Sequence, residues 1–556
     1  MGSVSARTVI TLVIALLLAT ASQGGRVLAR EKTGTPEQLT EFAGLVVDSI
    51  VIDNRDIYDT SDPEFASFIF AWANRLHWKT AADVIRREVL VEKGKPFDPR
   101  LAEETGRNLR QRLVLYDAWL EVEQTAQDSV LVRVVTIDEW SLAAIVNLTQ
   151  VDDGRRWQAG LRESNLFGRD LLLDLSYHSE PREGDYFSAV YGDDRLYGKP
   201  LKLNLSYNDN PVASIQSLTI GHPFYDMSQN LWYRLRFIEA NGRRDIYSDR
   251  RRIGQSEYTS DRTELGLAWR TGSYSRKLTA AIDYLYTCSR VQDPRVIGSD
   301  SEDSSGVRAA LPEDSLYHQL EVGLEYREMD FIKLRRVDGF GYTEDFVLGF
   351  AATVAAGRAV SEDRDLYNLF TLGAGYTTYS NSNLMSVCLR GNTWVSEGNT
   401  HRSLMSASAR VYNRSLPFLT FAFAAGYTRD YRPDGTNPLI LGGRHLRGYP
   451  DYFRTGDRLM SINTEARVFT GLSLLTIELG AVAFADFGRV WQHDGLGTGN
   501  LYGSGGIGLR FSSKNASRAA LGRIDLSYSE TNGWSVGVSS GQFFGAAIGF
   551  TPLTSY

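Results

Sequence analysis

The chain has 556 residues, a net charge of −7 and 43% hydrophobic residues. This length exceeds that of one small domain, and the acidic balance excludes a general affinity for nucleic acid. Glycine is abundant at 51 residues and aromatic residues make up 11%, whereas there are only 15 prolines. Such a composition favours many strands and turns over disorder.

Cysteine and histidine positions give no sign of a metal or redox centre. The two cysteines, Cys288 and Cys388, lie far apart in alternating patterns, and the seven histidines are scattered singly. No spacing typical of metal ligands occurs, so we expect no metal and no cofactor. The sequence leaves the disulfide status of the two cysteines open.

Residues 1–21 have the features of an export signal. Arg7 supplies a positive start, Val9 to Leu18 form an apolar run, and Ala19-Thr20-Ala21 offers a cleavage site. The run is short for a helix that crosses a membrane in about 20 residues. The rest of the chain has no uninterrupted apolar segment of that length. We therefore expect an exported protein that is either soluble or spans a membrane as a barrel.

Residues 46–139 predict a small α+β domain. A strand is expected at 46–54 and a helix over 62–77, whose apolar residues recur at helical spacing: Phe65, Ile69, Trp72 and Leu76. A second helix is expected from Thr80, where Thr80 and Asp83 form a capping pattern.

A third helix and two strands complete this domain. Asp98 is the expected N-cap of the helix and Pro99 its first residue. Strands are expected at 115–124 and 129–138, where alternation follows the period of two. All three helices lie between the first strand and the last two strands, so the order is β-α-α-β-β with one added helix after the first strand.

From residue 140 to 556 the sequence alternates between apolar and polar residues in many short runs. In 319–326 and 462–468, apolar residues on one face oppose charged residues of both signs on the other. A soluble sandwich seldom needs so many similar strands. Together with the export signal, the pattern favours an antiparallel transmembrane barrel with its apolar face toward lipid. A soluble periplasmic β-repeat protein remains the alternative.

The number of runs and the aromatic positions extend this hypothesis. Five strands are counted after residues 441–450 and about fifteen before, which makes about 20 in all. Four aromatic residues near strand ends are expected in the girdles at the membrane interfaces: Trp232, Trp269, Tyr326 and Tyr528.

Residues 441–450, LGGRHLRGYP, interrupt the strand pattern. Arg447, Gly448 and Tyr449 lie in a glycine-rich stretch between two long successions of strands. A solvated turn explains such a stretch by itself. Its position between the strands favours a loop that folds back into a confined polar space.

Several segments together resemble the BamA/TamA-like outer-membrane assembly superfamily, which joins POTRA domains to a bacterial surface antigen barrel. The resemblance rests on LGGRHLRGYP and on five further segments in order: VIRREVLVEKGKPFDP (84–99), RESNLFG (162–168), AVAFADFGRVW (481–491), LYGSGGIGLRF (501–511) and LGRIDLSYS (521–529). It spans about residues 46–545. It implies one POTRA domain followed by a barrel, which has sixteen strands in that family.

The resemblance also implies roles for individual residues. Arg447 would point into the lumen and pair with Asp486, and a bidentate pair would fix the loop. A POTRA domain would accept a client strand at its sheet edge. Only one such domain is visible here, and Leu446 stands where the family often has valine. The last run, 534–544, ends in aromatic residues as in the family, but twelve more residues follow.

Two short motifs match enzyme fingerprints without their context. The glycines of 503–508 match a dinucleotide-binding pattern, but no helix follows. Residues 537–541 match a nucleophile elbow, yet they lie inside a strand pattern. His445 beside the loop motif reads as a solvated or hydrogen-bonded histidine. We therefore expect no enzyme.

The leading functional hypothesis is an outer-membrane factor for protein insertion, assembly or translocation. A barrel whose first and last strands pair poorly can open sideways and offer its edge to a client strand. The expected seam joins Trp140 and Leu142 to Trp534 and Phe544. Expected partners are unfolded outer-membrane proteins, the lipid bilayer and periplasmic accessory proteins, with the N-terminal domain in the periplasm. The alternative is a passive pore or secretion channel, and the client set stays open.

Overall fold

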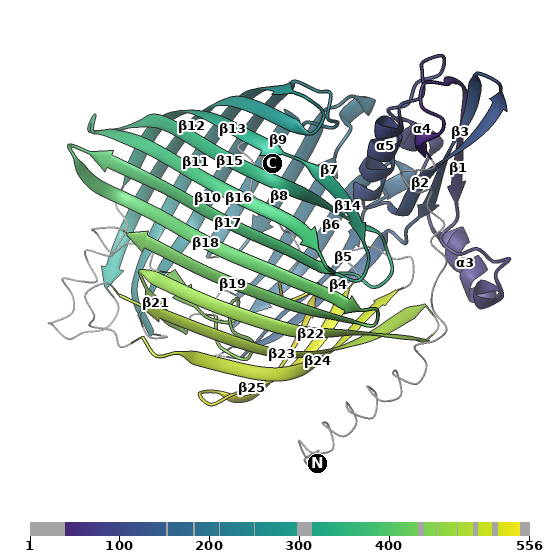
Figure 1. Ribbon diagram of the computed structural model, residues 1–556. Helices are drawn as coiled ribbons and strands as arrows, with labels where there is room; N and C mark the ends of the chain where they lie inside the picture. The colour runs from purple at the N-terminus through teal and green to yellow at the C-terminus, as the bar shows by residue number, and fades with distance from the viewer. Residues whose placement is uncertain are drawn as a thin grey trace, which may run out of the picture.

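A computed structural model shows a large β-barrel with a small α/β unit at one end (Figure 1). The structure describes residues 39–151, 154–181, 184–210, 212–248, 251–296, 314–431, 439–451, 453–474, 476–492, 499–513 and 521–544. The expected export signal at residues 1–21 lies outside these ranges. Within them, no helix is long and apolar enough to cross a membrane.

The N-terminal domain, residues 39–139, is built on a three-stranded sheet. Its strands are β1 (Val46–Arg55), β2 (Leu115–Ala126) and β3 (Ser129–Asp138), in the order β1-β3-β2, with β1 parallel and β2 antiparallel to β3. Helices α4 (Ala82–Arg86) and α5 (Pro99–Gln111) supply apolar residues to its core. Val130, Val132 and Val134 of β3 form the centre of that core and are fully buried.

Two of the three expected helices differ from the prediction. The helix expected over 62–77 is divided into a short 3-10 turn, η1 (Pro63–Phe65), and α3 (Phe68–Leu76). The capping role expected of Thr80 is wrong, because α4 has Ala81 as its N-cap. Thr80 instead donates its backbone N–H to Asp138 of β3 at 2.8 Å. The cap of α5 is as expected: the Asp98 side chain accepts from the N–H of Arg100, and Pro99 is the first residue.

Within the residues that the structure describes, twenty strands close the barrel when β14 is counted with β13, so the run count of about 20 is confirmed and the sixteen strands of the resembled family do not describe this chain. The short β14 continues β13 along β15. The strands are β4 (Leu142–Val151), β5 (Gly154–Glu163), β6 (Leu171–Glu180), β7 (Gly184–Asp193), β8 (Lys202–Asp209), β9 (Ala213–His222), β10 (Leu231–Ser248), β11 (Arg251–Gly272), β12 (Arg276–Val296), β13 (Ser315–Glu328) with β14 (Asp330–Leu334), β15 (Glu344–Ser361), β16 (Leu366–Ser380), β17 (Asn383–Ser396), β18 (Asn399–Leu416), β19 (Leu419–Tyr431), β22 (Arg458–Leu474), β23 (Ile477–Trp491), β24 (Tyr502–Ser513), β25 (Gly522–Ser529) and β26 (Gly533–Ser540).

The barrel wall exposes its apolar residues and buries its charges. On β13, Leu320, Val322 and Leu324 are 48–54% exposed, whereas Glu325 is 5% exposed. The same holds on β22, where Glu465 and Arg467 are almost fully buried. A water-soluble protein shows the opposite arrangement, so the outer face is suited to lipid and the polar face lines the lumen.

Three of the four expected girdle aromatics lie on the outer face, and one does not. Trp269, Tyr326 and Tyr528 are 58%, 37% and 47% exposed. Trp232 is only 1% exposed and packs beside Ala268 and Ala281, so its assignment to a girdle is wrong. Tertiary packing inside the wall outweighs its position near a strand end.

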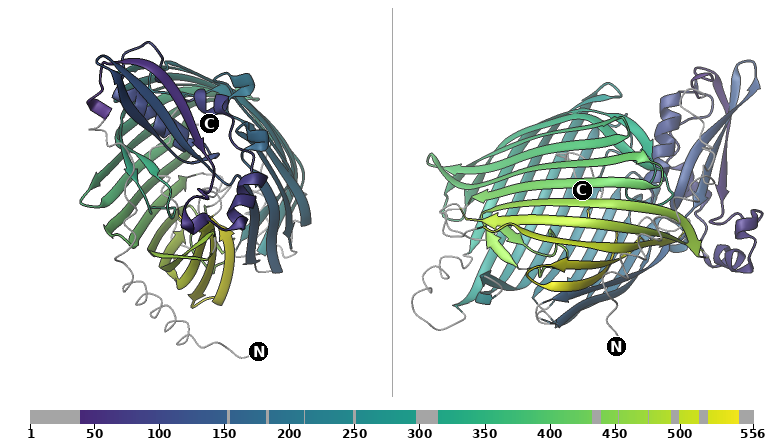
Figure 2. Two further views of the ribbon diagram at one scale, coloured as in Figure 1. Left: turned by 90° about the vertical axis from the view of Figure 1, so that its right-hand side faces the viewer. Right: turned by 60° about the horizontal axis from the view of Figure 1, so that its bottom comes forward.

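The N-terminal domain contacts the barrel through charged and polar groups, at what we call the near end (Figure 2, left). Arg110 of α5 donates to both carboxylate oxygens of Asp345 on β15, at 2.7 and 2.6 Å. The N–H of Met227, in the β9–β10 turn, donates to Glu104 at 2.6 Å. These contacts fix α5 against the near-end turns.

A buried ionic cluster extends this contact to the β5–β6 and β7–β8 turns. Arg112 bonds Glu88 at 2.7 Å and Asp194 at 2.8 Å, and it lies 3.4 Å from Asp170. Arg195 holds Glu88 through two bonds of 2.8 Å. Burial acts to raise the pKa of Glu88, but the two guanidinium groups outweigh it and the pKa is lowered.

Candidate functional site

The loop of residues 441–453, which we call the inner loop, enters the lumen from the far end of the barrel. It follows β20 (Leu439–Leu441) and leads into β21 (Arg454–Gly456), which pair with each other. Its apolar residues Leu446, Tyr449 and Phe453 pack on Leu459 and Val490 of the wall. The Tyr449 hydroxyl also donates to the carbonyl of Gly503 on β24 at 2.9 Å.

Arg447 is the most heavily bonded residue of the inner loop. Its Nε and Nη2 donate to the two carboxylate oxygens of Asp486 on β23, each at 2.7 Å. Its Nη1 donates to Glu465 on β22 at 2.6 Å. The guanidinium also lies between two rings, 3.6 Å from the centre of Phe484 and 4.3 Å from that of Phe543. Two carboxylates and two aromatic faces therefore fix one cation that is 5% exposed.

Gly448 brings the inner loop close to β25. Its φ is +81°, which favours glycine. A Cβ atom at this position would lie 2.6 Å from the hydroxyl oxygen of Ser527. A larger residue would therefore push the loop from the wall and displace Arg447 from its carboxylates.

Asp451 attaches the other side of the inner loop to β5. Its carboxylate pairs with Arg156, whose Nε also lies 3.0 Å from Glu180 on β6. Arg447 and Gly448, in contrast, contact β22, β23 and β25. The loop therefore holds strands on both sides of the junction between β4 and β26, which we call the seam.

The seam is the weakest ladder of the ring. Among the residues that the structure describes, its register consists of one pair, Val538↔Leu148. The adjoining ladders have ten pairs between β4 and β5 and eight between β25 and β26. One further contact comes from a side chain, because Asn147 accepts from the N–H of Ser540 at 3.2 Å.

Gly541 ends the last strand early. It has a φ of +75°, and its N–H donates to the carbonyl of Leu521 at 2.7 Å. The chain then turns into the lumen, where Phe543 contacts Arg447 and Phe544 packs near Leu334 and Val337. The near-end part of β4 consequently has no β26 residue at its level, since the strand stops at Ser540.

The four residues expected at the seam are therefore dispersed. Leu142 begins β4 and Trp534 lies on β26, both on the outer face at 44% and 60% exposure. Trp140 lies before β4 and packs against Ile57 and Phe70 of the N-terminal domain. Phe544 lies inside the lumen.

Below Arg447, a network of arginines and carboxylates continues toward the near end. Glu465 accepts from Arg467 Nε at 2.8 Å as well as from Arg447. Arg467 donates to Asp338 in the β14–β15 connection at 2.8 Å and to the carbonyl of Phe544 at 2.7 Å. The inner loop, a near-end connection and the C-terminal segment thus meet at two side chains of β22.

Sequence reasoning paired Arg447 with Asp486 but did not assign Glu465, Arg467, Asp338 or Arg510 to the site. Arg510 on β24 bonds Asp525 on β25 at 2.6 Å and lies 3.8 Å from Glu465. The sequence contained one signal for this charged network: the strands carry opposite charges on the face that alternation assigns to the lumen. Which of them meet depends on the register between strands, and a single sequence does not define it.

The two cysteines and the two glycine motifs lie on strands of the barrel wall or at a strand end. Cys288 and Cys388 are free cysteines on β12 and β17. The two glycine motifs lie in β24 and at the end of β26, as their strand pattern predicted. In the described ranges, no group of three or more histidine, cysteine or acidic side chains is placed to hold a metal ion.

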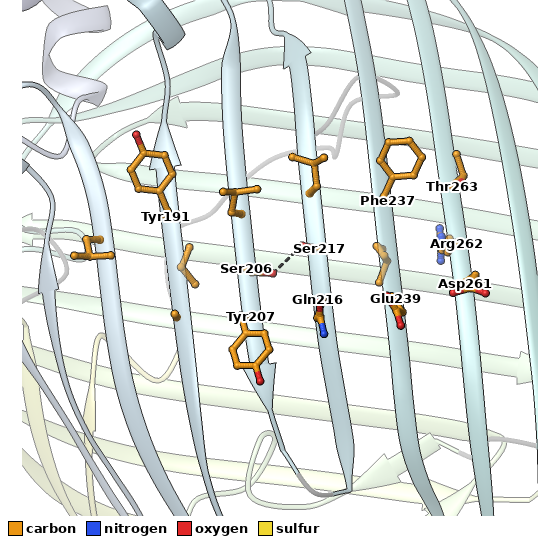
Figure 3. Close-up of a pocket in the computed structure, with 16 residues that line it drawn as sticks. Tyr191, Ser206, Tyr207, Gln216, Ser217, Phe237, Glu239, Asp261, Arg262 and Thr263 are labelled. Atoms are coloured by element: carbon orange, nitrogen blue, oxygen red, sulfur yellow. Dashed lines mark hydrogen bonds between the residues drawn. The ribbon is translucent and has the colours of Figure 1, made fainter.

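A hollow of about 560 Å³ lies on the wall formed by β6 to β11, away from the seam (Figure 3). Tyr191, Tyr207 and Phe237 surround it, and Ser206 and Ser217 are joined by a 2.7 Å hydrogen bond on the other face. It includes no residue of the inner loop or the seam.

No protein family model and no curated protein matches this sequence. Solved structures similar to the chain are outer-membrane barrels of several kinds. BamA from Haemophilus ducreyi lacking POTRA domains 1–3 is 10% identical, with 90% of this chain and 84% of that chain covered and a TM-score of 0.41. CdiB from Escherichia coli is 12% identical, covering 90% and 77% with a TM-score of 0.46. The FrpB iron transporter from Neisseria meningitidis is 9% identical, covering 91% and 96% with a TM-score of 0.39.

Proposed function

We propose that this outer-membrane barrel is an assembly or translocation factor that opens sideways at the seam between β4 and β26. The observation that carries this proposal is the single register pair Val538↔Leu148, beside ladders of ten and eight pairs. A ladder with so few hydrogen bonds needs the least free energy to open. The residues of 84–99, 162–168 and 441–450 that resemble the BamA/TamA-like superfamily support the same function.

An open seam offers a client what lipid lacks. Backbone N–H and C=O groups without partners in the membrane interior cost several kcal/mol each, so an unfolded strand gains by pairing with an exposed edge. The near-end part of β4 has no β26 neighbour beyond Ser540, and it is the edge to which we assign the first client contact. The mechanism forms no covalent bond and needs no cofactor.

The inner loop acts as a latch in this proposal. Because Asp451 pairs with Arg156 on β5 while Arg447 pairs with Asp486 on β23, the loop holds the two sides of the seam together from inside. Opening requires one of these attachments to break. The Arg156 side chain is 35% exposed and that of Arg447 is 5% exposed, so the Arg156–Asp451 pair is the one we expect to yield.

The N-terminal domain is assigned the role of a POTRA domain in the periplasm. Its order β1-β3-β2 leaves β2 and the part of β1 after Val47, whose N–H already donates to Lys95, as edges, and an edge strand can accept an extended client segment. The contacts of α5 with the near-end turns place this domain beside the barrel opening. A client strand bound at a sheet edge of this domain then has only a short distance to move to the seam.

Depletion of the protein separates this function from the alternative of a passive pore or secretion channel. Loss of an assembly factor is expected to lower the amounts of many outer-membrane proteins together. Loss of a pore removes one solute flux or one cargo and leaves the other barrels at normal abundance. Quantitative proteomics of the outer membrane after depletion distinguishes the two, and unchanged barrel abundance would overturn the proposal.

A further inference from the structure

Helix α3 has an apolar surface that the N-terminal domain does not cover. Phe68, Trp72 and Leu76 are 81%, 63% and 56% exposed, and Ile69 between them is 39% exposed. Only Phe70 of the helix is buried. The sequence pattern that predicted this helix from Ile69, Trp72 and Leu76 therefore marks its outward face.

This surface is unusual for a helix that faces water. A surface helix normally places apolar residues on one face and charged residues on the other. In α3 the inward face is already apolar, since Phe70 and Ala73 pack with Tyr58 and Trp140. The outward face is apolar as well, and Arg75 is the only charged residue in the helix. Exposed patches of this kind mark sites of interaction.

The position of α3 joins this surface to the lipid-facing wall. Trp140, which packs under the helix, precedes Leu142 by two residues, and Leu142 is the first outward residue of β4 at 44% exposure. Two strand residues span about 7 Å. Two residues after the end of the helix, Trp78 contacts Phe167 in the β5–β6 turn, with ring centres 5.2 Å apart and ring planes tilted by 48°. Figures 1 and 2 show α3 projecting at the near end, apart from the three-stranded sheet.

The support beneath α3 reaches strands on both sides of the seam. Tyr58, whose ring packs on Phe70, forms side-chain hydrogen bonds with Thr476 in the β22–β23 turn and Ser513 at the end of β24. Trp140 belongs to the segment that enters β4. The helix is therefore supported from the wall as well as from the sheet of the N-terminal domain, where its C-cap residue His77 lies 2.8 Å from Asp138 of β3.

We propose that α3 is an interfacial helix that inserts its outward face into the near-end leaflet of the membrane, next to β4. Its partner is the phospholipid bilayer surface. The nine residues of α3 make about 14 Å of helix, enough to lie in the headgroup region but too short to cross it. Tryptophan prefers this region, and Arg75 can extend its guanidinium to lipid phosphates. Continuity with the apolar wall favours lipid over a protein partner at this surface.

Brominated phospholipids test the proposal on the full-length protein. The protein is reconstituted into vesicles with bromine atoms either near the headgroup or near the bilayer centre, and Trp72 fluorescence is obtained as the difference between the wild type and Trp72→Phe. We expect headgroup-proximal bromine to quench Trp72 about twofold or more, and central bromine to quench it less. The matched control is Trp119→Phe, because Trp119 lies on β2 and hydrogen-bonds Glu121.

A second variant separates insertion from folding. Phe68→Ser/Leu76→Ser keeps Trp72 and the buried Phe70, so we expect the domain to remain folded while the outward face loses two of its four apolar side chains. We expect quenching of Trp72 to fall to the level of Trp119. Equal quenching of Trp72 and Trp119 in the wild type would overturn the proposal. The proposal would also be overturned if Trp72 were shielded from solvent in cell envelopes but not in pure lipid vesicles, because that result assigns the surface to a protein partner.

Discussion

Arg156 on β5 and Asp451 in the inner loop form an ion pair that joins the two sides of the seam. Glu180 on β6 also holds Arg156, at 3.0 Å. The pair is partly exposed, so it contributes modestly to stability. In the proposed mechanism its role is to hold the strands on the two sides of the weak seam together.

The first prediction concerns this pair. Arg156→Ala should let the seam open more often, because the inner loop then holds only the strands on one side. Planar-bilayer recordings should show more frequent or larger openings than in the wild type. Arg155→Ala is the matched control, since Arg155 is the neighbouring, exposed arginine of β5. Identical recordings for Arg156→Ala and the wild type would remove the pair from the mechanism.

The second prediction concerns the cation at the centre of the inner loop. Arg447→Ala leaves the buried Asp486 without its ion-pair partner, whereas Glu465 keeps Arg467; the loss costs about 3–5 kcal/mol, or less in a wet lumen. Arg447→Lys keeps the charge but loses the bidentate bond and the stacking on Phe484, so an intermediate loss is expected.

The measurement for Arg447 variants has two parts. Barrels that remain folded resist unfolding in detergent at room temperature, which a gel-shift assay on heating reports. Assembly of other outer-membrane proteins reports function. We expect Arg447→Ala and Asp486→Ala to lower assembly while folded barrel persists. Normal assembly in both variants at normal abundance would contradict the role assigned to the pair.

How far the sequence predicts this structure depends on whether a feature is local. Wall strands such as β13 were predictable because lipid and lumen impose opposite preferences on alternate residues, as Leu320 and Glu321 illustrate. The cap of α5 at Asp98 was predictable because it involves residues two apart. The pairing of Arg447 with Asp486 came from the resemblance to a family and not from the residues alone.

Features that depend on long-range packing were not predictable. The final run, 534–544, reads as one strand, but Gly541 adopts a positive φ and Phe543 and Phe544 lie in the lumen. Trp232 reads as an interfacial residue, but small neighbours on adjacent strands leave room for it inside. The meeting of Glu465 with Arg510 depends on the register of the wall, which a shift of one residue would destroy.

The third prediction follows from Gly541. Gly541→Val disfavours a φ of +75°, at a cost of about 1–2 kcal/mol for a residue with a side chain. Because the substituted residue prefers extended backbone, we expect β26 to continue along β4 and the seam to close. Amide hydrogen exchange should then slow in residues 142–148, and assembly activity should decrease. Exchange in that segment as fast as in the wild type would show that Gly541 does not set the end of the strand.

The fourth prediction concerns pH and the contact between the N-terminal domain and the barrel. Asp170 lies in the β5–β6 turn, where burial raises its pKa to about 7; Arg112 opposes the shift, and the carboxylates of Asp194 and Glu88 add to it. The pKa of Asp170 in the unfolded chain is near 3.8. Between pH 3.8 and about 7, the folded state therefore binds one more proton than the unfolded state. The free energy of unfolding of this contact therefore decreases as pH rises through that window and is level above it.

Asp170→Asn removes this ionisation. The stability of the variant relative to the wild type should rise between pH 3.8 and about 7 and stay level above that window, because only the wild type acquires a buried charge. Hydrogen exchange in α5 measures the effect, with Glu123→Gln on β2 as the control, since that side chain is 63% exposed. A pH profile shared by both variants would contradict the assignment to Asp170.

The most direct test of sideways opening is a reversible lock on the seam. In a background where Cys288 and Cys388 are replaced by serine, Leu148→Cys/Val538→Cys places two thiols at the register pair, where neighbouring Cα atoms lie about 4.5–5.5 Å apart and a disulfide can form. Leu526→Cys/Val536→Cys on the β25–β26 ladder is the control. We predict that oxidation abolishes assembly of other outer-membrane proteins only with the seam pair, and that reduction restores it. Full activity with the seam disulfide formed would contradict the account.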